Sequence, residues 1–180
     1  DEANMYMREM QYCIDFALAN RELMMQRVLQ YLFWWIGGHW TTEPSINIAH
    51  NYAKIENHYG ENVIIHRKGA TLAREGTIGV IPGSQGTKSY IVKGKGNRDS
   101  FDSCSHGAGR RMGRKQAKRE LNLEDEQKRL NDKGIIHSVR GISDLDEASG
   151  AYKDIDVVMK NQSDLVDIIV ELEPLGVIKG

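Results

Sequence analysis

The chain has 180 residues, 40% of them hydrophobic and 27% charged, and its formal net charge is −1. This balance predicts a soluble globular protein with one core, and it excludes a chain whose overall basicity marks a nucleic-acid partner. Two distant cysteines, Cys13 and Cys104, favour a reducing, cytoplasmic location. We expect no membrane partner, because the sequence has no signal peptide and no apolar run of membrane-spanning length.

Residues 4 to 35 are expected to form one long helix or a broken pair of helices. Apolar side chains recur at roughly helical spacing from Tyr12 onward, and Gly37 and Gly38 end the pattern. Five of the seven methionines and all three tryptophans lie in the first 40 residues. Such a composition is typical of an adaptable core or docking face, so this helix is expected to need a partner surface outside the chain.

Two strands are expected after this helix. Ile46 and Ile48 alternate with other residues ahead of a polar cluster at His50 and Asn51, which predicts a strand that ends at the cluster. A second strand is expected from Val63 to His66.

A glycine-rich segment follows, with 11 of the 18 glycines between Gly60 and Gly113. Within it, a strand from Ile78 enters the turn Pro82-Gly83-Ser84-Gln85-Gly86-Thr87, and a second strand leaves at Ser89. A turn rich in Gly, Ser and Thr offers N–H and O–H donors to a phosphate, although this one lacks the spacing of a P-loop. A plain hairpin turn is the alternative interpretation of the same string.

The stretch from Ser103 to Arg111 sets His106 ahead of a Gly107-Ala108-Gly109 turn, and two arginines follow that turn. Imidazole is a nucleophile, glycines let a phosphate approach backbone N–H groups, and guanidinium groups neutralise phosphate charge. The arrangement therefore suits transfer of a phosphoryl or nucleotidyl group onto His106. A Gly-rich turn that leads into a basic helix is the alternative.

Residues 110 to 119 contain six Lys or Arg and no acid. Positive charge near a helix N-terminus opposes the helix dipole, so a bound polyanion such as RNA explains the segment better than solvation alone. The elements expected beyond it are a helix capped by Asn122 and Gly134, a strand at 135–139, a helix that is capped by Asp154 and runs toward Asp164, and a strand-like apolar run at 165–178.

Six strings stand in order along the chain: H-N-Y-A at 50–53, H-R-K-G-A-T at 66–71, I-P-G-S-x-G-T-x-S-Y at 81–90, S-H-G-A-G-R at 105–110, G-A-Y-K-D-I-D at 150–156 and V-I-K-G at 177–180. Together they resemble the RtcB family of RNA-splicing ligases. The resemblance implies an α+β fold of mixed sheets with flanking helices, and it makes residues 1–180 a single C-terminal portion of an RtcB-like catalytic domain. Its parts would be a helical segment (1–40), the Gly-rich β loops with the nucleophile (45–110) and an α/β C-terminal part (111–180).

The resemblance implies a GTP- and Mn²⁺-dependent enzyme that joins RNA 3′-phosphate or 2′,3′-cyclic phosphate ends to 5′-hydroxyl ends. It makes His106 the nucleophile that becomes guanylylated, and His50 a Mn²⁺ ligand. Arg110, Arg111 and the basic residues after them would hold RNA or triphosphate. The implied contacts with the guanine nucleotide are Asn51, Pro82, Gly83, Ser84, Gln85, Ser89, Gly107, Ala108, Gly109, Arg110 and Lys179.

Two positions depart from the family pattern, which commonly has Met where Gln85 stands and Ser where Gly113 stands. The family's other Mn²⁺ ligands, an Asp, a Cys and two His, belong to an N-terminal half that is not found in this sequence. One imidazole cannot hold a catalytic Mn²⁺ alone, so the expected partners are RNA, GTP and that N-terminal half. The alternative is a non-catalytic module that binds GTP or RNA through the same loops.

Overall fold

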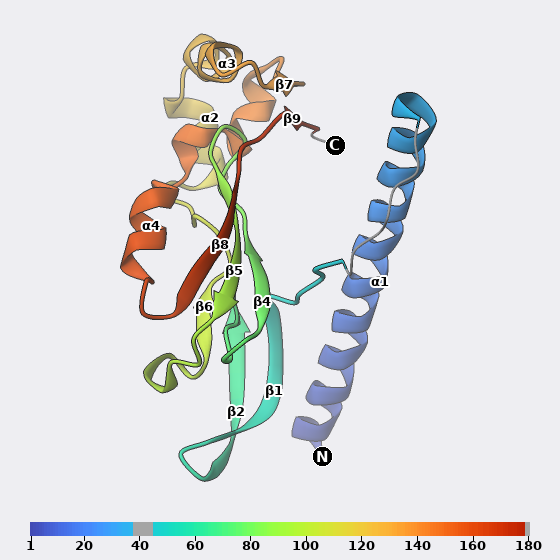
Figure 1. Cartoon of the computed structure of the whole chain (residues 1–180), viewed down its shortest axis with the longest axis vertical. Helices are drawn as coiled ribbons and strands as arrows, with labels where there is room; N and C mark the ends of the chain where they lie inside the picture. Colours follow the sequence, from blue (N-terminus) through green and yellow to red (C-terminus); the bar gives the residue numbers. More distant parts are fainter. Residues whose placement is uncertain (38–44, 179–180) are drawn as a thin grey trace. The chain divides into compact units, whose positions relative to one another are not determined.

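The computed structural model describes residues 1–37 and 45–178, which form two compact units, an N-terminal unit (Asp1–Thr71) and a C-terminal unit (Leu72–Gly180) (Figure 1). Helices are combined with small sheets, so the predicted α+β class is confirmed. The boundary between the units lies inside the glycine-rich segment. Across the two described ranges, no helix has both the length and the apolar character needed to cross a bilayer.

The N-terminal unit begins with one long helix, α1 (Glu2–Ile36), which confirms the single-helix alternative. The Asp1 side chain caps it by accepting a hydrogen bond from the backbone N–H of Ala3 (3.1 Å), and Gly37 follows its last turn with φ +65°. None of the helix residues is buried, and Tyr12 and Trp34 are 73% and 77% exposed. Within the described part of the chain, many apolar side chains of α1 therefore remain exposed.

The strand expected across Ile46 and Ile48 is wrong, because residues 45–49 have no regular secondary structure. Arg21 of α1 donates from Nε to the side-chain oxygen of Asn47 (2.8 Å) and from Nη2 to the carbonyl oxygen of Ile48 (3.4 Å). These bonds tie the polar groups of the segment to the helix instead of to a neighbouring strand.

The rest of the N-terminal unit is an antiparallel hairpin of β1 (Asn51–His58) and β2 (Glu61–Lys68). The second strand confirms and extends the one expected at Val63 to His66. β3 (Ala70–Leu72) follows at the boundary between the two units.

The hairpin buries a cluster of charged and polar side chains. The guanidinium group of Arg67 is only 2% exposed, and it donates to both carboxylate oxygens of Glu56 at 2.5 and 2.9 Å and to the hydroxyl of Tyr52 at 2.8 Å. His58 adds a contact of 3.1 Å between its Nε2 and the Glu56 carboxylate. Since a charge buried without its partner is costly, the hairpin depends on this pairing.

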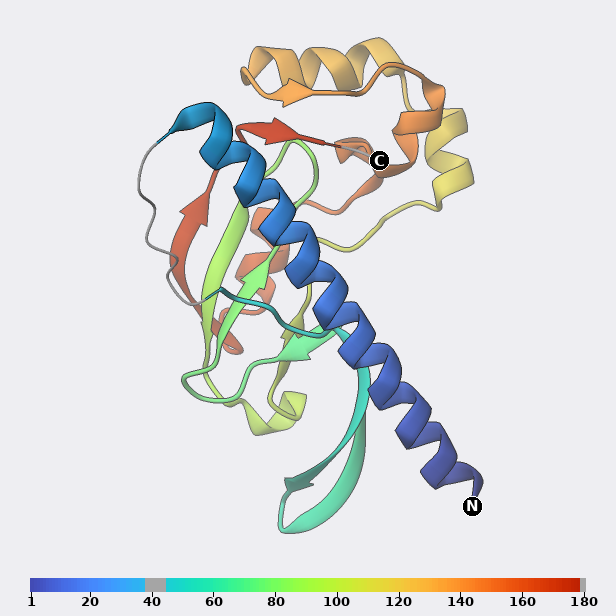
Figure 2. The same ribbon diagram turned by 90° about the vertical axis from the view of Figure 1, so that its right-hand side faces the viewer.

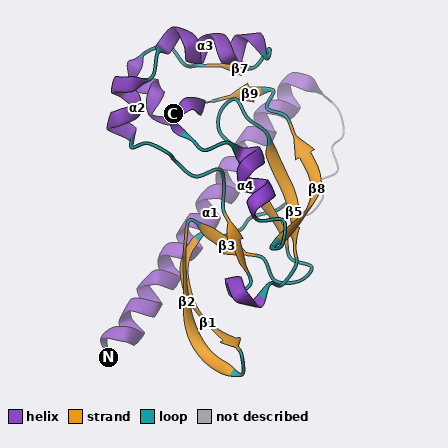
Figure 3. Cartoon of the chain, turned by 90° about the vertical axis from the view of Figure 1, so that its left-hand side faces the viewer, coloured by secondary structure: helices purple, strands orange, loops and turns teal. Residues whose placement is uncertain are grey.

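The core of the C-terminal unit lies on an antiparallel sheet of β4 (Ile78–Ile81), β5 (Ser89–Gly94) and β8 (Val166–Leu172), in the order β4-β5-β8. The predicted hairpin that leaves Ile78 and returns at Ser89 is confirmed. Helix α4 (Ile155–Asn161) lies against one face of the sheet (Figure 3). The buried side chains between them include Ile81, Tyr90, Val92, Ile155, Met159 and Val166.

A second layer of the C-terminal unit contains α2 (Arg114–Glu120) and α3 (Leu123–Asp132). The Asn122 side chain caps α3 by accepting from the N–H of Asp125 (3.1 Å), as predicted. The C-cap of α3 is Lys133, and Gly134 comes one residue later with φ +67°. The sequence therefore located both ends of α3 to within one residue.

The strand expected at 135–139 is shorter than predicted, because β7 covers only Ile136–His137. The N–H of Val139 donates to Nδ1 of His137 (3.3 Å), and the carbonyl oxygen of Val139 accepts from Nε2 of Gln127 (2.9 Å). Both backbone groups of Val139 are thus taken by side chains and not by a strand. α3 and β7 run side by side (Figure 2).

Short elements connect these layers: η1 (Arg98–Ser100), β6 (Ser103–Ser105), η2 (Ile142–Glu147) and η3 (Ser149–Ala151). Asp154 caps α4, as predicted, by accepting from the N–H of Asp156 (2.9 Å), but the helix ends at Asn161 and does not continue toward Asp164. The apolar run at 165–178 divides into β8 and β9 (Gly176–Val177), with Pro174, which has no N–H to donate, between them. β9 pairs in parallel with β7.

The buried charge cluster predicts a specific response to substitution. Arg67→Met is expected to lower the free energy of unfolding by about 3–5 kcal/mol, because the Glu56 carboxylate would remain buried without its cation. The Glu56→Gln/Arg67→Met double variant should recover most of this loss, since no charge is then left unpaired. Urea titration monitored by circular dichroism measures the unfolding free energy of both variants, with Lys68→Met, at an exposed position, as control. A double variant as unstable as Arg67→Met would contradict the assignment.

Candidate active site

Two loops of the C-terminal unit meet, namely the turn 82–89 between β4 and β5 and the loop 105–110 after β6. The N–H of Ala108 donates to the carbonyl oxygen of Pro82 at 3.1 Å. A Cβ placed on Gly107 would stand 3.0 Å from the same oxygen, so a side chain at position 107 would push the two backbones apart. The structure therefore brings together two of the strings that the sequence analysis singled out separately.

The turn 82–89 is braced by its own hydroxyl groups. The N–H of Gly83 donates to Oγ of Ser89 (3.3 Å), and the N–H of Ser84 donates to Oγ1 of Thr87 (2.6 Å). A Cβ on Gly83 would lie 2.1 Å from the carbonyl oxygen of Lys88, so only glycine fits there. Because the Ser89 oxygen accepts in this arrangement, its O–H remains able to donate to a phosphate.

The same turn is held from outside by residues that sequence reasoning missed. The N–H of Gly86 donates to Oγ of Ser149 (3.0 Å), and Nζ of Lys133 donates to the carbonyl oxygen of Gly86 (2.7 Å). A Cβ on Gly86 would stand 3.1 Å from the buried Leu130 side chain. These partners lie 63 and 47 positions along the chain from Gly86, so no local pattern connects them.

His106 is partly buried, which leaves its imidazole within reach of a ligand. The residue before it is fixed by α4, because the N–H of Ser105 donates to Oε1 of Gln162 (3.0 Å). Gln162 is itself buried and donates from Nε2 to the sulfur of Met159 (3.2 Å). Gly109 then turns the chain with φ +71°, a conformation that favours glycine. Gln162 is a positioning residue that no local motif indicated.

Arg110 is held inside the protein by four groups. Its Nε donates to the carbonyl oxygen of Met112 (3.1 Å), its Nη1 lies 3.2 Å from both the Tyr152 hydroxyl and a Glu147 carboxylate oxygen, and its Nη2 donates to the carbonyl oxygen of Asp146. The guanidinium carbon also lies 5.0 Å from the centre of the Tyr152 ring. Arg110 thus ties the loop after His106 to η2 and to the residues ahead of α4. Its contact with nucleotide stays a prediction.

Glu147 is the acid at the centre of this network. Its partial burial pushes its pKa upward, but hydrogen bonds from Tyr152 and Arg114 and the positive charges of Arg110 and Arg114 outweigh burial and hold the pKa below its usual value. The carboxylate is therefore charged across the neutral range and keeps both arginines in place.

His50 and Asn51 belong to the N-terminal unit, whereas His106 and the turn 82–89 belong to the C-terminal unit. The N–H of Gly69 donates both to the carbonyl oxygen of His50 (2.9 Å) and to Oδ1 of Asn51 (3.1 Å), which closes the open end of the β1–β2 hairpin. Within residues 1–37 and 45–178, no three His, Cys, Asp or Glu side chains form a group that could hold a metal ion. Lys179 lies outside the described residues.

Comparison with known proteins identifies the family of this arrangement. The family model described as tRNA-splicing ligase RtcB matches residues 1–180. The chain belongs to the RtcB family. It is 41% identical over 181 residues to an RNA-splicing ligase RtcB of Escherichia coli (strain K12). The aligned region covers 97% of this chain and 43% of that relative. It is 34% identical over 224 residues to a tRNA-splicing ligase RtcB of Methanopyrus kandleri, covering 100% of this chain and 21% of the relative.

A third relative, a tRNA-splicing ligase RtcB of Thermococcus kodakarensis, is 33% identical over 207 residues, which cover all of this chain and 42% of that protein. The chain therefore spans less than half the length of the RtcB relatives that it matches. The family assignment applies to the whole chain.

Gln85 gives a prediction that concerns the turn of this RtcB chain. Its Oε1 is buried and has no hydrogen-bond partner in the part of the chain that the structure describes. Gln85→Met is expected to raise the free energy of unfolding by about 1 kcal/mol, because an unpaired buried carbonyl is replaced by an apolar group of similar length. Urea titration by circular dichroism measures this, and Gln116→Met on α2 serves as control. A loss of stability at position 85 would contradict it.

Glu147 gives a prediction about pH. A carboxylate whose folded pKa is lowered adds stability above its unfolded pKa of about 4.3, and that stability is lost as the pH falls through the lowered folded pKa. The difference in unfolding free energy between the parent chain and Glu147→Gln should therefore be constant near neutral pH and shrink below about pH 4. Urea midpoints measured at several pH values test it, with the exposed Glu124→Gln as control. A difference that grows on acidification would refute the assignment.

Proposed function

We propose that this RtcB chain is part of an RNA ligase that joins RNA 3′-phosphate or 2′,3′-cyclic phosphate ends to 5′-hydroxyl ends through a guanylylated His106. The observation that carries the proposal is the close approach of the His106 loop to the turn 82–89, through the bond from Ala108 N to Pro82 O at 3.1 Å. The names of the relatives, RNA-splicing and tRNA-splicing ligases, support the same class of reaction.

From an RNA 3′-phosphate end the proposed reaction has three steps, of which His106 takes part in the first two. A 2′,3′-cyclic phosphate end is first opened by water to the 3′-phosphate. An imidazole nitrogen of His106 attacks the α-phosphorus of GTP, a P–N bond forms, and pyrophosphate leaves. An oxygen of the RNA 3′-phosphate then attacks the same phosphorus, which breaks the P–N bond and frees the imidazole. The 5′-hydroxyl of the second strand finally attacks the activated 3′-phosphate, GMP leaves, and a phosphodiester forms.

The turn and the loop would hold the nucleotide during the first step. The Ser89 hydroxyl is available as a donor because its oxygen already accepts from Gly83 N (3.3 Å). The bond from Ser105 to Gln162 sets the backbone just before His106, the residue that carries the proposed nucleophile. Asn51 and Lys179 remain proposed nucleotide contacts on the strength of the RtcB resemblance.

The described residues do not form a complete site for Mn²⁺. His50 is one imidazole, and no group of three potential ligands is found within residues 1–37 and 45–178. A catalytic Mn²⁺ is bound by several nitrogen and oxygen ligands, so we propose that the remaining ligands come from the part of an RtcB protein that this chain does not span.

RNA would contact the basic segment 110–119. Arg114 and Lys118 face the acids of η2, at 3.0 Å from Glu147 and 3.5 Å from Asp146. Beyond Arg110, Lys115 and Arg119 are exposed and carry their charge toward solvent. Arg111 is exposed too, although its Nε donates to the carbonyl oxygen of Gly150 (2.8 Å). A polyanion that neutralises such a face binds with a strong dependence on salt.

Labelling with radioactive GTP tests the proposal. The chain is combined with the portion of the Escherichia coli relative that it does not match, in the presence of Mn²⁺. A covalent adduct that is labile to acid and stable to alkali should form on this chain, because a phosphoramidate has that stability. His106→Ala should abolish the adduct, whereas His66→Ala, an exposed histidine of β2, should leave it unchanged.

An adduct that survives His106→Ala would sink the proposal. If no adduct forms while RNA binds with a steep salt dependence, the non-catalytic module is the better description.

A further inference from the structure

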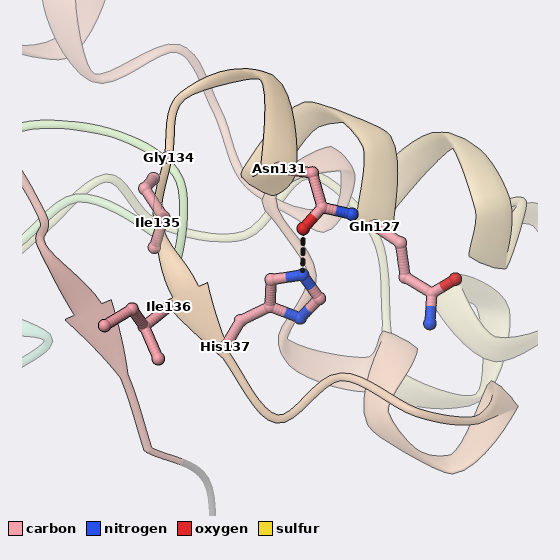
Figure 4. A pocket seen from close by; sticks show the side chains of 6 residues that line it. All are labelled: Gln127, Asn131, Gly134, Ile135, Ile136 and His137. Atoms are coloured by element: carbon pink, nitrogen blue, oxygen red, sulfur yellow. Dashed lines mark hydrogen bonds between the residues drawn. The ribbon is translucent and has the colours of Figure 1, made fainter.

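A pocket between α3 and β7 has no role in the proposed reaction. It is a cavity of about 590 Å³, within the range of small-ligand sites, and its lining comes from the C-terminal half of α3 and the chain that follows: Gln127, Asn131, Gly134, Ile135, Ile136 and His137 (Figure 4).

The orientation of His137 in this pocket is fixed by both ring nitrogens. Nδ1 accepts from the backbone N–H of Val139 (3.3 Å), so the ring proton lies on Nε2. Nε2 therefore donates to Oδ1 of Asn131 (3.1 Å). This bond in turn fixes the amide of Asn131, because its oxygen faces the histidine and its nitrogen points toward Gln127 (Figure 4).

The amides of Gln127 and Asn131 on α3 keep hydrogen-bonding groups that they can offer to a ligand. Gln127 donates from Nε2 to the carbonyl oxygen of Val139 (2.9 Å), and within the described residues its Oε1 accepts no hydrogen bond. The Nδ2 of Asn131 likewise donates to no described residue. The residues are four positions apart, which puts both groups on one face of the helix.

We infer that this pocket binds an unpaired nucleobase of the RNA substrate. Side-chain amides pair with the donor and acceptor groups on base edges, and histidine rings stack on bases that are splayed out of single strands. Gln127 and Asn131 supply the first kind of contact, and the ring of His137, held in place by its two hydrogen bonds, supplies the second. Ile136 lines the pocket as well and offers no polar side-chain group to a base.

The place of the pocket in the fold agrees with this ligand. Lys133, just past the end of α3, donates to the carbonyl oxygen of Gly86 in the turn 82–89 (2.7 Å), and Leu130 of α3 packs against Gly86. The helix that lines the pocket is thus fixed to the proposed nucleotide turn. Lys128, next to Gln127 in sequence, and Arg140, three residues after His137, are exposed cations for the phosphates of a bound strand.

The inference rests on the proposed function, since it takes RNA as the substrate, and binding experiments separate the two. Fluorescence anisotropy with a labelled short single-stranded RNA should show roughly tenfold weaker binding for Gln127→Met/Asn131→Leu than for the parent chain. The control Asn161→Leu, an exposed amide of α4, should bind as the parent does. An abasic strand of the same length should bind the parent and the double variant equally, because it has no base to lose.

Photocrosslinking on the unaltered chain gives a second readout that does not depend on the variants folding. RNA that carries 4-thiouridine should crosslink within residues 127–137, as mapped by mass spectrometry. Crosslinks confined to the basic segment 110–119, or equal RNA binding by parent and double variant, would overturn the inference and leave the pocket to a ligand such as a peptide.

Guanylylation assays distinguish failure of the base-pocket inference from failure of the proposed ligase function. The double variant should still form the His106 adduct with GTP in the presence of the complementing portion. If the parent chain is not labelled by GTP but RNA still crosslinks at 127–137, the ligase proposal fails and the inference of a base-binding pocket is retained.

Discussion

The backbone contact between Pro82 and Ala108 is the constraint on which the candidate site depends. Pro82 continues directly from Ile81, which is completely buried in the core of the C-terminal unit, and Ala108 is buried as well. The loop that carries His106 is therefore held in position by its contact with the core, although its glycines would otherwise let it move. Since misplacement of a reacting group by about 1 Å costs roughly a hundredfold in rate, a nucleophile on a Gly-rich loop needs such an anchor.

The turn 82–89 is fixed in a similar way from three directions. The hydroxyls of Ser89 and Thr87 hold its backbone from within, Ser149 and Lys133 hold Gly86 from outside, and the side chain of Leu130 closes the space above Gly86. A site that is assembled before its ligand arrives spends less binding energy on ordering itself. The two glycines with the tightest surroundings, Gly83 and Gly86, are the places where this assembly tolerates no side chain.

The sequence predicted those features that depend on neighbours along the chain. The cap of α3 at Asn122, the cap of α4 at Asp154 and the hairpin through Ser89 follow from local hydrogen bonding and alternation, and the structure confirms them. The strand predicted across Ile46 and Ile48 does not form, and the one predicted at 135–139 is shorter than expected. In both segments a side chain from a distant element, Arg21 or Gln127, binds a backbone group that a strand would use. Periodicity carries no information on such contacts.

The candidate site likewise contains residues that a local sequence pattern indicates and residues that only the folded structure reveals. His106 and the turn stand out in the sequence because nucleophile, glycine and hydroxyl residues are close together there. Gln162, Ser149 and Lys133, which position them, come from distant elements and have no pattern of their own. Arg110 was expected to hold phosphate, yet its guanidinium group also braces the loop against Glu147 and Tyr152, a role that only the folded arrangement reveals.

The tryptophan fluorescence of this protein comes from one part of the chain, at and just beyond the end of α1. All three tryptophans occur in the first 40 residues, and Trp34 and Trp35 are solvent-exposed with their rings edge to face at 5.4 Å. Intrinsic tryptophan emission therefore reports on the N-terminal unit alone, and the C-terminal unit with His106 is silent at those wavelengths. A partner that covers Trp34 and Trp35 at the end of α1 will therefore shift that emission to shorter wavelength, without a label being added.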